Sequence, residues 1–411
     1  MAAHSERNVM LSTLANIVFF FVFTYCFLSV GYIFLFSFWG RFFFNKKSLQ
    51  TSEPKNRIAI LVPAYKEDGI ILSTASNLLR LNYPPELYDV YIIADSFKPS
   101  TINDLKELPI HVLEVSFDKS TKTKSLNEAF RRIDKDYDIG LICDADNILA
   151  RDFLSHINNA FVNGAKAVQG RRVAKNLDSP FAILDACSEG INNNIFRKGA
   201  NALGLSSAVI GSGMAFQYEN LKNIMSQVHA VGGFDKILQL KIVEQGIKIQ
   251  YLEDALIFDE KVDSSQAFKQ QRKRWVSSQF IYLKQFFGPA ITQVFKGNFS
   301  YFNLAIANNL VLPRAYLLAI LPLLVVAALF LNSTWIIASA TLLCLYIFSL
   351  LIALPKELIN KDLVTAIFRL PKAVLMMIAA LFQIKKSNKT FIHTVHTKTE
   401  VSNTLFKDHV N

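Results

Sequence analysis

Cysteine is scarce in this sequence. Only four cysteines occur in 411 residues, and no two of them have the short spacing of a metal-binding or redox pair: Cys26, Cys143, Cys187 and Cys344. Scattered cysteines of this kind favour reduced, structural thiols and are typical of a protein whose globular part faces the cytosol.

Sequence motifs of several common enzyme classes are also absent. There is no GxxxxGK[ST] sequence and no GxGxxG after an expected strand, which disfavours NTPases and dinucleotide enzymes. A GxSxG nucleophile turn is missing, as is any His/Cys spacing typical of a metal site. His393 and His396 near the C-terminus could be ligands, but solvated side chains are the favoured interpretation. We also find no internal repeat and no low-complexity segment.

The charge balance is basic, with a formal net charge of +11. Such a balance suits nucleic acid, anionic lipid or phosphorylated substrates. However, the sequence has no DNA- or RNA-binding motif, and its cations gather near the ends of apolar runs rather than on one helix. Nucleic acid is therefore not an expected partner.

Long apolar runs are abundant, since 51% of the residues are hydrophobic and 34 are phenylalanines. Residues 10–40 form a run that is too long for a signal-peptide core and exceeds the roughly 20 residues needed to span a bilayer. Only Arg7 precedes it, whereas Arg41, Lys46 and Lys47 follow. The positive-inside rule therefore places the chain from residue 41 onward in the cytosol.

The C-terminal third contains further apolar runs. Residues 309–331 and 334–354 are predicted to form a spanning pair, whereas 363–384 is interrupted by two cations and a proline. This last run could span, kink or lie in the interface, and the sequence leaves these alternatives open. Few charged residues lie inside the runs, which disfavours a stand-alone transporter.

Residues 57–260 have a different pattern, in which short apolar runs alternate with amphipathic stretches. This order predicts an α/β fold of the Rossmann-like kind, with a mostly parallel sheet and helices on both faces. Ligands bind such sheets at the carboxyl ends of the strands, so polar residues that end apolar runs are candidate site residues.

Polar groups and one glycine turn follow four of the expected strands: Pro63, Tyr65 and Glu67; Asp95; Asp144 and Asp146; and Gly211, Ser212 and Gly213. Taken singly, an aspartate after a strand is more often a turn former than a ligand. Two carboxylates two residues apart at the end of a buried strand would repel each other, however. A divalent cation such as Mg²⁺ or Mn²⁺ would relieve that repulsion.

These residues resemble the family 2 membrane glycosyltransferases, which include the cellulose, chitin and hyaluronan synthases. The resemblance rests on Asp95, the Asp-Ala-Asp sequence, a later carboxylate and the Q-x-x-R-W sequence of residues 271–275, in this order and before membrane segments. It covers residues 57–275. The resemblance implies a GT-A fold and sugar transfer from a nucleotide diphosphate donor.

The resemblance also implies residue roles. Those for the donor fall on Pro63, Tyr65, Glu67 and Asp95 at the nucleoside, Asp144 at the ribose, Asp146 at a Mg²⁺ or Mn²⁺ ion, and Lys122 and Arg274 at the diphosphate. Those for the acceptor fall on Gly211, Ser212, Gly213, Gln271 and Trp275. Both glycines beside the family's lysine are replaced here, which leaves the choice between Lys122 and Lys124 open.

The catalytic base is harder to place, because the family's T-E-D triplet is not intact. Counting back from Gly246 puts Asp235 at its aspartate, with Phe234 in place of its glutamate. Asp235 is therefore the predicted base. Four other carboxylates are rivals: Glu253, Asp254, Asp259 and Glu260. Residues 258–261 are more consistent with a strand end that pairs with nearby cations.

The predicted organisation has a transmembrane helix in 1–40, a cytosolic GT-A domain in 41–286 and an interfacial amphipathic segment in 276–305. Transmembrane or interfacial helices follow in 306–384, and a basic tail in 385–411. The chain is thus predicted to be an integral protein of the cell's inner or plasma membrane, with the catalytic domain in the cytosol.

The predicted function is inverting, metal-dependent transfer of a hexose or N-acetylhexosamine from a UDP-sugar to a glycan acceptor, extending an exported or cell-envelope β-linked polysaccharide. One alternative is a single transfer to a lipid or short glycan, and another is a non-catalytic membrane scaffold. A polymer path through so few spans would require a homodimer or an export partner. No short motif encodes the sugar.

Overall fold

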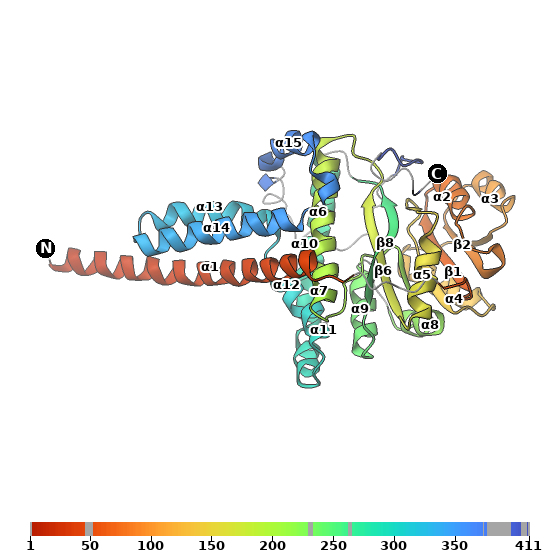
Figure 1. Ribbon diagram of the computed structural model, residues 1–411, viewed down its shortest axis with the longest axis horizontal. Coiled ribbons are helices and arrows are strands. Elements are labelled where there is room, and N and C mark those ends of the chain that lie inside the picture. The colour runs from red at the N-terminus through yellow and green to blue at the C-terminus, as the bar shows by residue number, and fades with distance from the viewer. Residues whose placement is uncertain are drawn as a thin grey trace.

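The computed structural model describes residues 2–45, 52–228, 233–261, 265–372, 374–375, 396–403 and 409, with the backbone alone described at 2–5, 7–9, 265–278 and 280. At one end of the molecule lies a domain built on a sheet, and at the other end a long N-terminal helix extends outward beside two further helices (Figure 1).

The sheet has eight strands in the order β3-β2-β1-β4-β7-β6-β8-β5. Their bounds are β1 Ile58–Tyr65, β2 Tyr88–Asp95, β3 His111–Val115, β4 Ile139–Ile142, β5 Ile148–Leu149, β6 Ala167–Ala174, β7 Met214–Gln217 and β8 Gln250–Asp259. Strands β1 to β4 pair in parallel, as do β6 and β8. Strand β7 runs antiparallel to both β4 and β6, and β5 runs antiparallel to β8, so the sheet is mixed.

Helices cover both faces of the sheet, as the sequence predicts. One face packs on α2 (Ile71–Leu78), α3 (Pro99–Lys106) and α5 (Phe153–Val162), and the other on α4 (Lys122–Arg132), α8 (Tyr218–Met225) and α9 (Phe234–Glu244). Strand β1 contributes Ile58 and Ile60 to the first core and Ala59 and Leu61 to the second. Because side chains alternate along a strand, a continuous apolar run supplies two cores at once.

The apolar helices are α1 (Ala2–Phe42), α13 (Arg314–Ala328) and α14 (Ser333–Ala353). Within the described residues, Met10–Phe42 and Ser333–Ala353 are long and apolar enough to cross a membrane. A third span results if Phe299–Leu310 and Arg314–Ala328, which are bent by 54°, are taken together. That bent pair contains α11 (Phe299–Phe302), η3 (Asn303–Ala307) and α12 (Asn308–Leu310).

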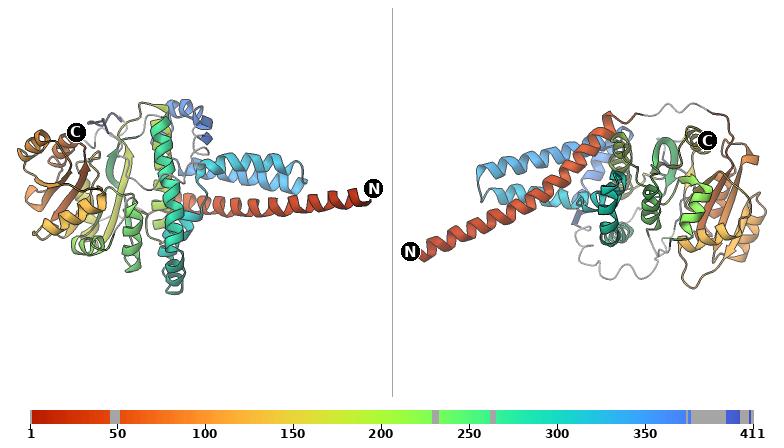
Figure 2. Two further views of the ribbon diagram at one scale, coloured as in Figure 1. Left: turned by 180° about the vertical axis from the view of Figure 1, so that it is seen from behind. Right: turned by 90° about the horizontal axis from the view of Figure 1, so that it is seen from below.

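Between the sheet and these apolar helices lie α6 (Pro180–Asn192), which continues through η2 (Asn193–Gly199) into α7 (Ala200–Ala202), and α10 (Ser265–Phe295) (Figure 2). The contact between α1 and η2 is close, because a Cβ on Gly199 would lie 2.2 Å from the Phe36 carbonyl oxygen. Glycine therefore permits the backbones to touch at the point where α1 meets the globular part.

Three short helices complete the described chain: η1 (Pro85–Leu87), η4 (Lys356–Leu358) and α15 (Lys361–Ile367). Helix α15 packs against α6 and occupies only the start of the run at 363–384. Most of the later part of that run lies outside the described residues. Whether it spans the membrane, kinks or lies in the interface therefore stays a prediction.

Candidate active site

The ends of β1 and β2 form the first part of the candidate site. Tyr65 and Asp95 are paired in the sheet register, and the residues after them, Lys66 and Ser96, have φ values of 54° and 60°. Residues other than glycine rarely adopt this left-handed backbone conformation, and such strain clusters at functional sites. Asp95 is fully buried, and its Oδ2 atom has no hydrogen-bond partner among the described residues. An orphaned buried carboxylate oxygen at a strand end fits a position that receives a donor from a ligand.

The Asp-Ala-Asp segment follows β4 and is held by the glycine turn that precedes β7. The Asp144 amide donates to Ser212 Oγ at 2.9 Å, and Ser212 is itself buried. A Cβ on Gly213 would lie 1.6 Å from the Ile257 side chain, and its φ is 58°. Ser212 and Gly213 thus help to hold this loop, and their predicted role at the acceptor site stays a prediction.

Lys122 and Asp235 both lie beside Gly211. The Lys122 ammonium contacts the Asp144 carboxylate and donates to the Gly211 carbonyl at 2.6 Å. A Cβ on Gly211 would lie 4.0 Å from Asp235 Cγ, and Lys122 Nζ lies 5.2 Å from the ring centroid of the adjacent Phe234. Four segments that are distant in sequence therefore meet here, including both the predicted base and a predicted diphosphate ligand.

The choice between the two lysines follows from α4. Thr121 caps this helix by accepting a hydrogen bond from the Lys124 amide, which fixes the rotation of the first turn. Lys124 Nζ donates to the Lys119 carbonyl at 2.8 Å and lies 5.7 Å from the Phe117 ring centroid. Lys124 thus points away from Asp144, and Lys122 is the lysine beside it.

Asp146 is buried, and its carboxylate lies near other acidic groups. Burial raises the pKa of Asp146 to about 6, and the charges of Asp144 and Asp259 act in the same direction. The described residues contain no ready-made cluster of three or more His, Cys, Asp or Glu ligands. One buried carboxylate with a second beside it nevertheless fits Mg²⁺ or Mn²⁺, which commonly complete their ligand shell with substrate phosphates.

The C-terminal tail enters this site, which corrects the interpretation of His396 as a solvated side chain. His396 Nδ1 lies 3.0 Å from Glu67 Oε1, and Nε2 lies 3.8 Å from Asp146 Oδ2. Burial alone would lower the pKa of His396, but Glu67 and Asp146 raise it to about 9. No local sequence pattern indicates the contact between His396 and Glu67, which are more than 300 residues apart, so the sequence analysis did not predict it. His393 lies outside the described residues.

The rival carboxylates have other contacts. Glu253 pairs with Lys198 at 2.6 Å, and Asp254 is exposed on β8. Asp259 lies 2.8 Å from Lys261 Nζ and 3.5 Å from Arg172 Nε. Glu260 accepts hydrogen bonds from the amides of residues 397 and 398. None of these contacts includes Gly211 or Lys122, so Asp235 stays the predicted base.

Arg274, predicted at the diphosphate, lies in the N-terminal half of α10 with Gln271 and Trp275, which are predicted at the acceptor. There the described structure is limited to backbone. Their predicted roles at the diphosphate and the acceptor therefore stay predictions. Pro63 and Tyr65 lie at the end of β1, where the sequence reasoning expects the nucleoside.

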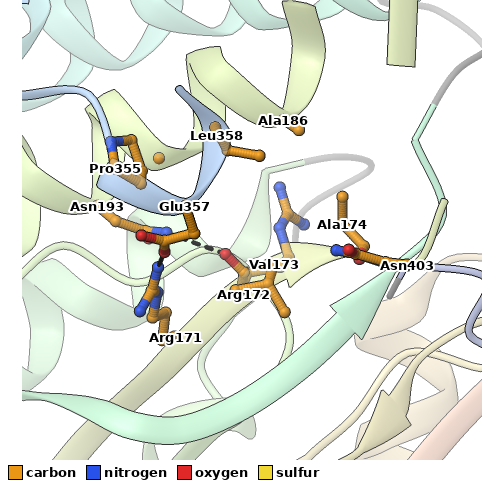
Figure 3. Close-up of a pocket in the computed structure, with 11 residues that line it drawn as sticks. Arg171, Arg172, Val173, Ala174, Ala186, Asn193, Pro355, Glu357, Leu358 and Asn403 are labelled. Atoms are coloured by element: carbon orange, nitrogen blue, oxygen red, sulfur yellow. Dashed lines mark hydrogen bonds and ion pairs between the residues drawn. The ribbon is translucent and has the colours of Figure 1, made fainter. Parts of the chain in front are cut away.

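A separate pocket lies behind the site, between β6, α6 and the segment after α14 (Figure 3). Arg171 and Arg172 line it, and Arg171 pairs with Glu357 across it. Arg172 turns toward α6, where it lies 3.0 Å from Glu189. These ion pairs join the sheet to α6 and to η4, and the sequence alone does not reveal them.

The fold and the strand-end carboxylates together define a GT-A glycosyltransferase domain. Residues 54–278, more than half of the chain, match the family described as glycosyltransferase like family 2, and the chain belongs to that family. The match corresponds to the sheet domain and the first part of α10.

Two curated relatives are similar to this chain, the beta-monoglucosyldiacylglycerol synthases of Trichormus variabilis and of a Nostoc species. Each is 27% identical over 237 residues, which cover 56% of this chain and 50% of the relative. The chain thus spans about half the length of these relatives. Among solved structures, a mannosyltransferase from Pyrobaculum calidifontis, in complex with GDP-Man and Mn²⁺, has a TM-score of 0.55 at 18% identity, covering 92% of this chain and 100% of that one. This likeness concerns the fold alone.

Proposed function

We propose that this protein transfers a hexose or N-acetylhexosamine from a UDP-sugar to a hydroxyl group presented at a membrane surface, with inversion at the anomeric carbon. The observation that carries the proposal is the meeting of Asp144, Lys122, Gly211 and Asp235 at the carboxyl edge of the sheet. It combines a base, a fixed cation and a pair of carboxylates within one site.

The chemistry follows from these groups. The Asp235 carboxylate accepts the proton of the acceptor hydroxyl, whose oxygen forms a bond to the anomeric carbon. The bond from that carbon to the diphosphate breaks on the opposite face, and UDP leaves with the electron pair. In this proposal the Lys122 ammonium stabilises the negative charge that develops on the diphosphate. A divalent cation held by Asp146 would neutralise more of that charge.

The acceptor is proposed to be a membrane lipid. Two observations support this choice over the growing polysaccharide that Q-x-x-R-W predicts. The curated relatives are named for a diacylglycerol product. In addition, α1, α13 and α14 pack on one another through an apolar cluster that includes Phe19, Leu321 and Leu342. Such packing favours anchoring over a hydrated path for a polymer. Polysaccharide extension stays the second candidate, and it would require a homodimer or an export partner.

The membrane arrangement is part of the proposal. Residues 1–40 and 306–384 would anchor the chain, residues 276–305 would lie at the cytosolic interface, and 41–286 would form the catalytic domain beneath it. Tyr282 of α10 supports this arrangement, because its ring packs on Gly233 at the start of α9, next to the proposed base. A base beside an interfacial helix is well placed for an acceptor that emerges from the bilayer.

The test is donor turnover by purified protein in lipid nanodiscs with and without diacylglycerol. UDP-glucose, UDP-N-acetylglucosamine, UDP-galactose and UDP-glucuronate are each offered with Mn²⁺, Mg²⁺ or EDTA. We expect EDTA-sensitive UDP release with one donor and a sugar-labelled product that partitions into organic solvent. A water-soluble product of high mass would replace the lipid acceptor by a polysaccharide. Absence of UDP release from folded protein with every donor would refute the proposal.

Asp235→Asn tests the base. General-base catalysis contributes about 10²–10⁴-fold, so we expect turnover to fall by that factor while the protein stays folded. The matched control is Asp254→Asn, an exposed carboxylate on β8, which should retain full turnover. Equal activity of the two variants would remove Asp235 from its proposed role.

A further inference from the structure

The ring of Tyr282 packs against the residue that precedes α9. A Cβ on Gly233 would lie 2.9 Å from both the Cε2 atom and the phenol oxygen of Tyr282, so no side chain fits between them. Gly233 also has a φ of 67°, a left-handed conformation that favours glycine. Its carbonyl accepts a hydrogen bond from the Lys236 amide at 3.0 Å, which closes the first turn of the helix. Tyr282 therefore fixes the point at which α9 begins.

The first turn of α9 carries the proposed base. Asp235 is the second residue of the helix and lies beside Gly211. Phe234, the residue before it, is buried, and its ring centroid lies 5.2 Å from Lys122 Nζ. Successive residues of a helix are rotated by about 100°, so a change in the start of α9 moves Asp235 and Phe234 together. The direction of the Asp235 carboxylate thus depends on the contact at Gly233.

Tyr282 is itself held in place by its own helix. It is 7% exposed, and its ring stacks on that of Phe286, with ring centroids 6.1 Å apart and ring planes at 22°. After α10 ends, the Asn298 side chain donates to the Val243 carbonyl at 2.9 Å, near the end of α9. Helix α10 and the turn that follows it therefore contact α9 at both of its ends.

The charge of the proposed base acts on the phenol of Tyr282. Burial is the larger cause that raises the pKa of Tyr282, and the negative charge of Asp235 raises it further, to about 12. The phenol therefore keeps its proton at neutral pH. Because a protonated phenol does not take the proton of an acceptor hydroxyl, its place near Asp235 indicates support of the base and not a second base.

We propose that Tyr282 is a positioning residue for the glycosyl transfer, which directs the Asp235 carboxylate through its packing on Gly233. The inference rests on the proposed function, because it takes Asp235 as the base. Trp275, predicted at the acceptor, lies seven residues before Tyr282 on the same helix, which is about two turns. In this proposal α10 connects the predicted acceptor residue to the base through one helix.

The experiment is a double-mutant cycle on the full-length protein in lipid nanodiscs, with Mn²⁺ and the UDP-sugar that gives UDP release from the wild type. A misplacement of about 1 Å can cost about 10²-fold, so Tyr282→Leu should lower kcat by about 10–100-fold. The KM for the donor should change less than about threefold. Tyr282→Phe keeps the ring and should stay within about threefold of the wild-type kcat. In an Asp235→Asn background, Tyr282→Leu should cause less than about threefold further loss, because the group that it positions is already absent.

The matched control is Tyr301→Leu, which changes a buried tyrosine of α11 in the core against which α10 packs. This variant should lower the melting temperature but retain kcat. Hydrogen exchange is the second measurement and needs no donor. Tyr282→Leu should increase exchange in the first turn of α9, which includes the Lys236 amide, and Tyr301→Leu should change it less.

An unchanged kcat in folded Tyr282→Leu protein would overturn the inference. A full additional loss in the Asp235→Asn background would overturn it as well, as would unchanged exchange in the first turn of α9. In each case the loss caused by Asp235→Asn alone still tests the proposed base. Failure of this inference is therefore distinguishable from failure of the proposed function.

Discussion

The buried ion pair that joins α6 to the sheet provides a quantitative test of the structure. Glu189 is 3% exposed and lies 3.0 Å from Arg172 and 3.3 Å from Arg197. Burial by itself raises the pKa of Glu189, but the two guanidinium groups lower it from 4.5 to about 2. At 1.36 kcal/mol per pH unit, this difference corresponds to about 3 kcal/mol in favour of the folded, ionised form. Removing one partner of a buried pair costs a similar amount, about 3–5 kcal/mol.

The perturbation is Glu189→Gln, which keeps the volume and removes the charge. We expect the melting temperature in detergent at pH 7 to fall by roughly 5 °C or more. The matched control is Glu128→Gln. The pKa of Glu128 is also lowered to about 2, by Arg131 and Arg132, but on the exposed side of α4. Solvent screens such a pair, so its loss should cost less than about 1 kcal/mol. Equal shifts for the two variants would refute the argument from burial.

The pH dependence has a definite sign. The folded pKa of Glu189 lies below its unfolded value, so the stabilisation is complete above pH 4.5 and is lost as the pH falls toward 2. The difference in stability between wild type and Glu189→Gln should therefore be constant from pH 8 to pH 5 and shrink by more than half at pH 3. A difference that grows on acidification would contradict the assigned ionisation.

Two further predictions concern Lys122 and the long apolar helix α1. Lys122→Ala should lower kcat for donor turnover by about 10²–10³-fold, whereas Lys124→Ala should change it less than threefold, because only Lys122 contacts the site; similar losses would contradict the assignment. Gly199→Ala should destabilise the protein by about 1–3 kcal/mol, because the added Cβ would lie 2.2 Å from the Phe36 carbonyl oxygen. Gly31→Ala is the control and should be neutral, because a Cβ on Gly31 would have no other atom within 4 Å. Both variants are measured by a thermal size-exclusion assay, and equal loss of stability would argue against the docking of α1 on η2.

The fold could be predicted largely because its signals are local. The apolar runs that become β1 and β2 are long and end at Tyr65 and Asp95, so both the strands and the strand-end carboxylates follow from the pattern. The direction of β7 does not, because the same apolar residues fit a parallel or an antiparallel strand. The turn through Gly211 and Gly213, both with positive φ, precedes the strand that pairs antiparallel.

Parts of the site depended on information that is not local. Lys122 and Lys124 are two residues apart on one helix, and only the rotation of α4 distinguishes them. His396 belongs to a polar tail whose sequence resembles any solvated terminus, and its contact with Glu67 joins residues that are more than 300 positions apart. In both instances the sequence supplied the right residue type, but the tertiary packing decided its place.

The ion pairs of Arg172 connect α6 to the loop that carries the two candidate carboxylates. Glu189 on α6 holds Arg172, and Arg172 lies 3.5 Å from Asp259 at the end of β8. Asp259 accepts from the Asn147 side chain at 3.4 Å, and the Asn147 amide donates to the Asp144 carbonyl at 3.1 Å. Each contact is modest, but together they run from α6 to the loop that carries both candidate carboxylates. Since an uncompensated charge in such a buried network is costly, displacement of α6 would disturb the Asp-Ala-Asp loop as well as the anchor. The same contacts therefore join α6, the end of β8 and the loop that carries Asp144 and Asp146.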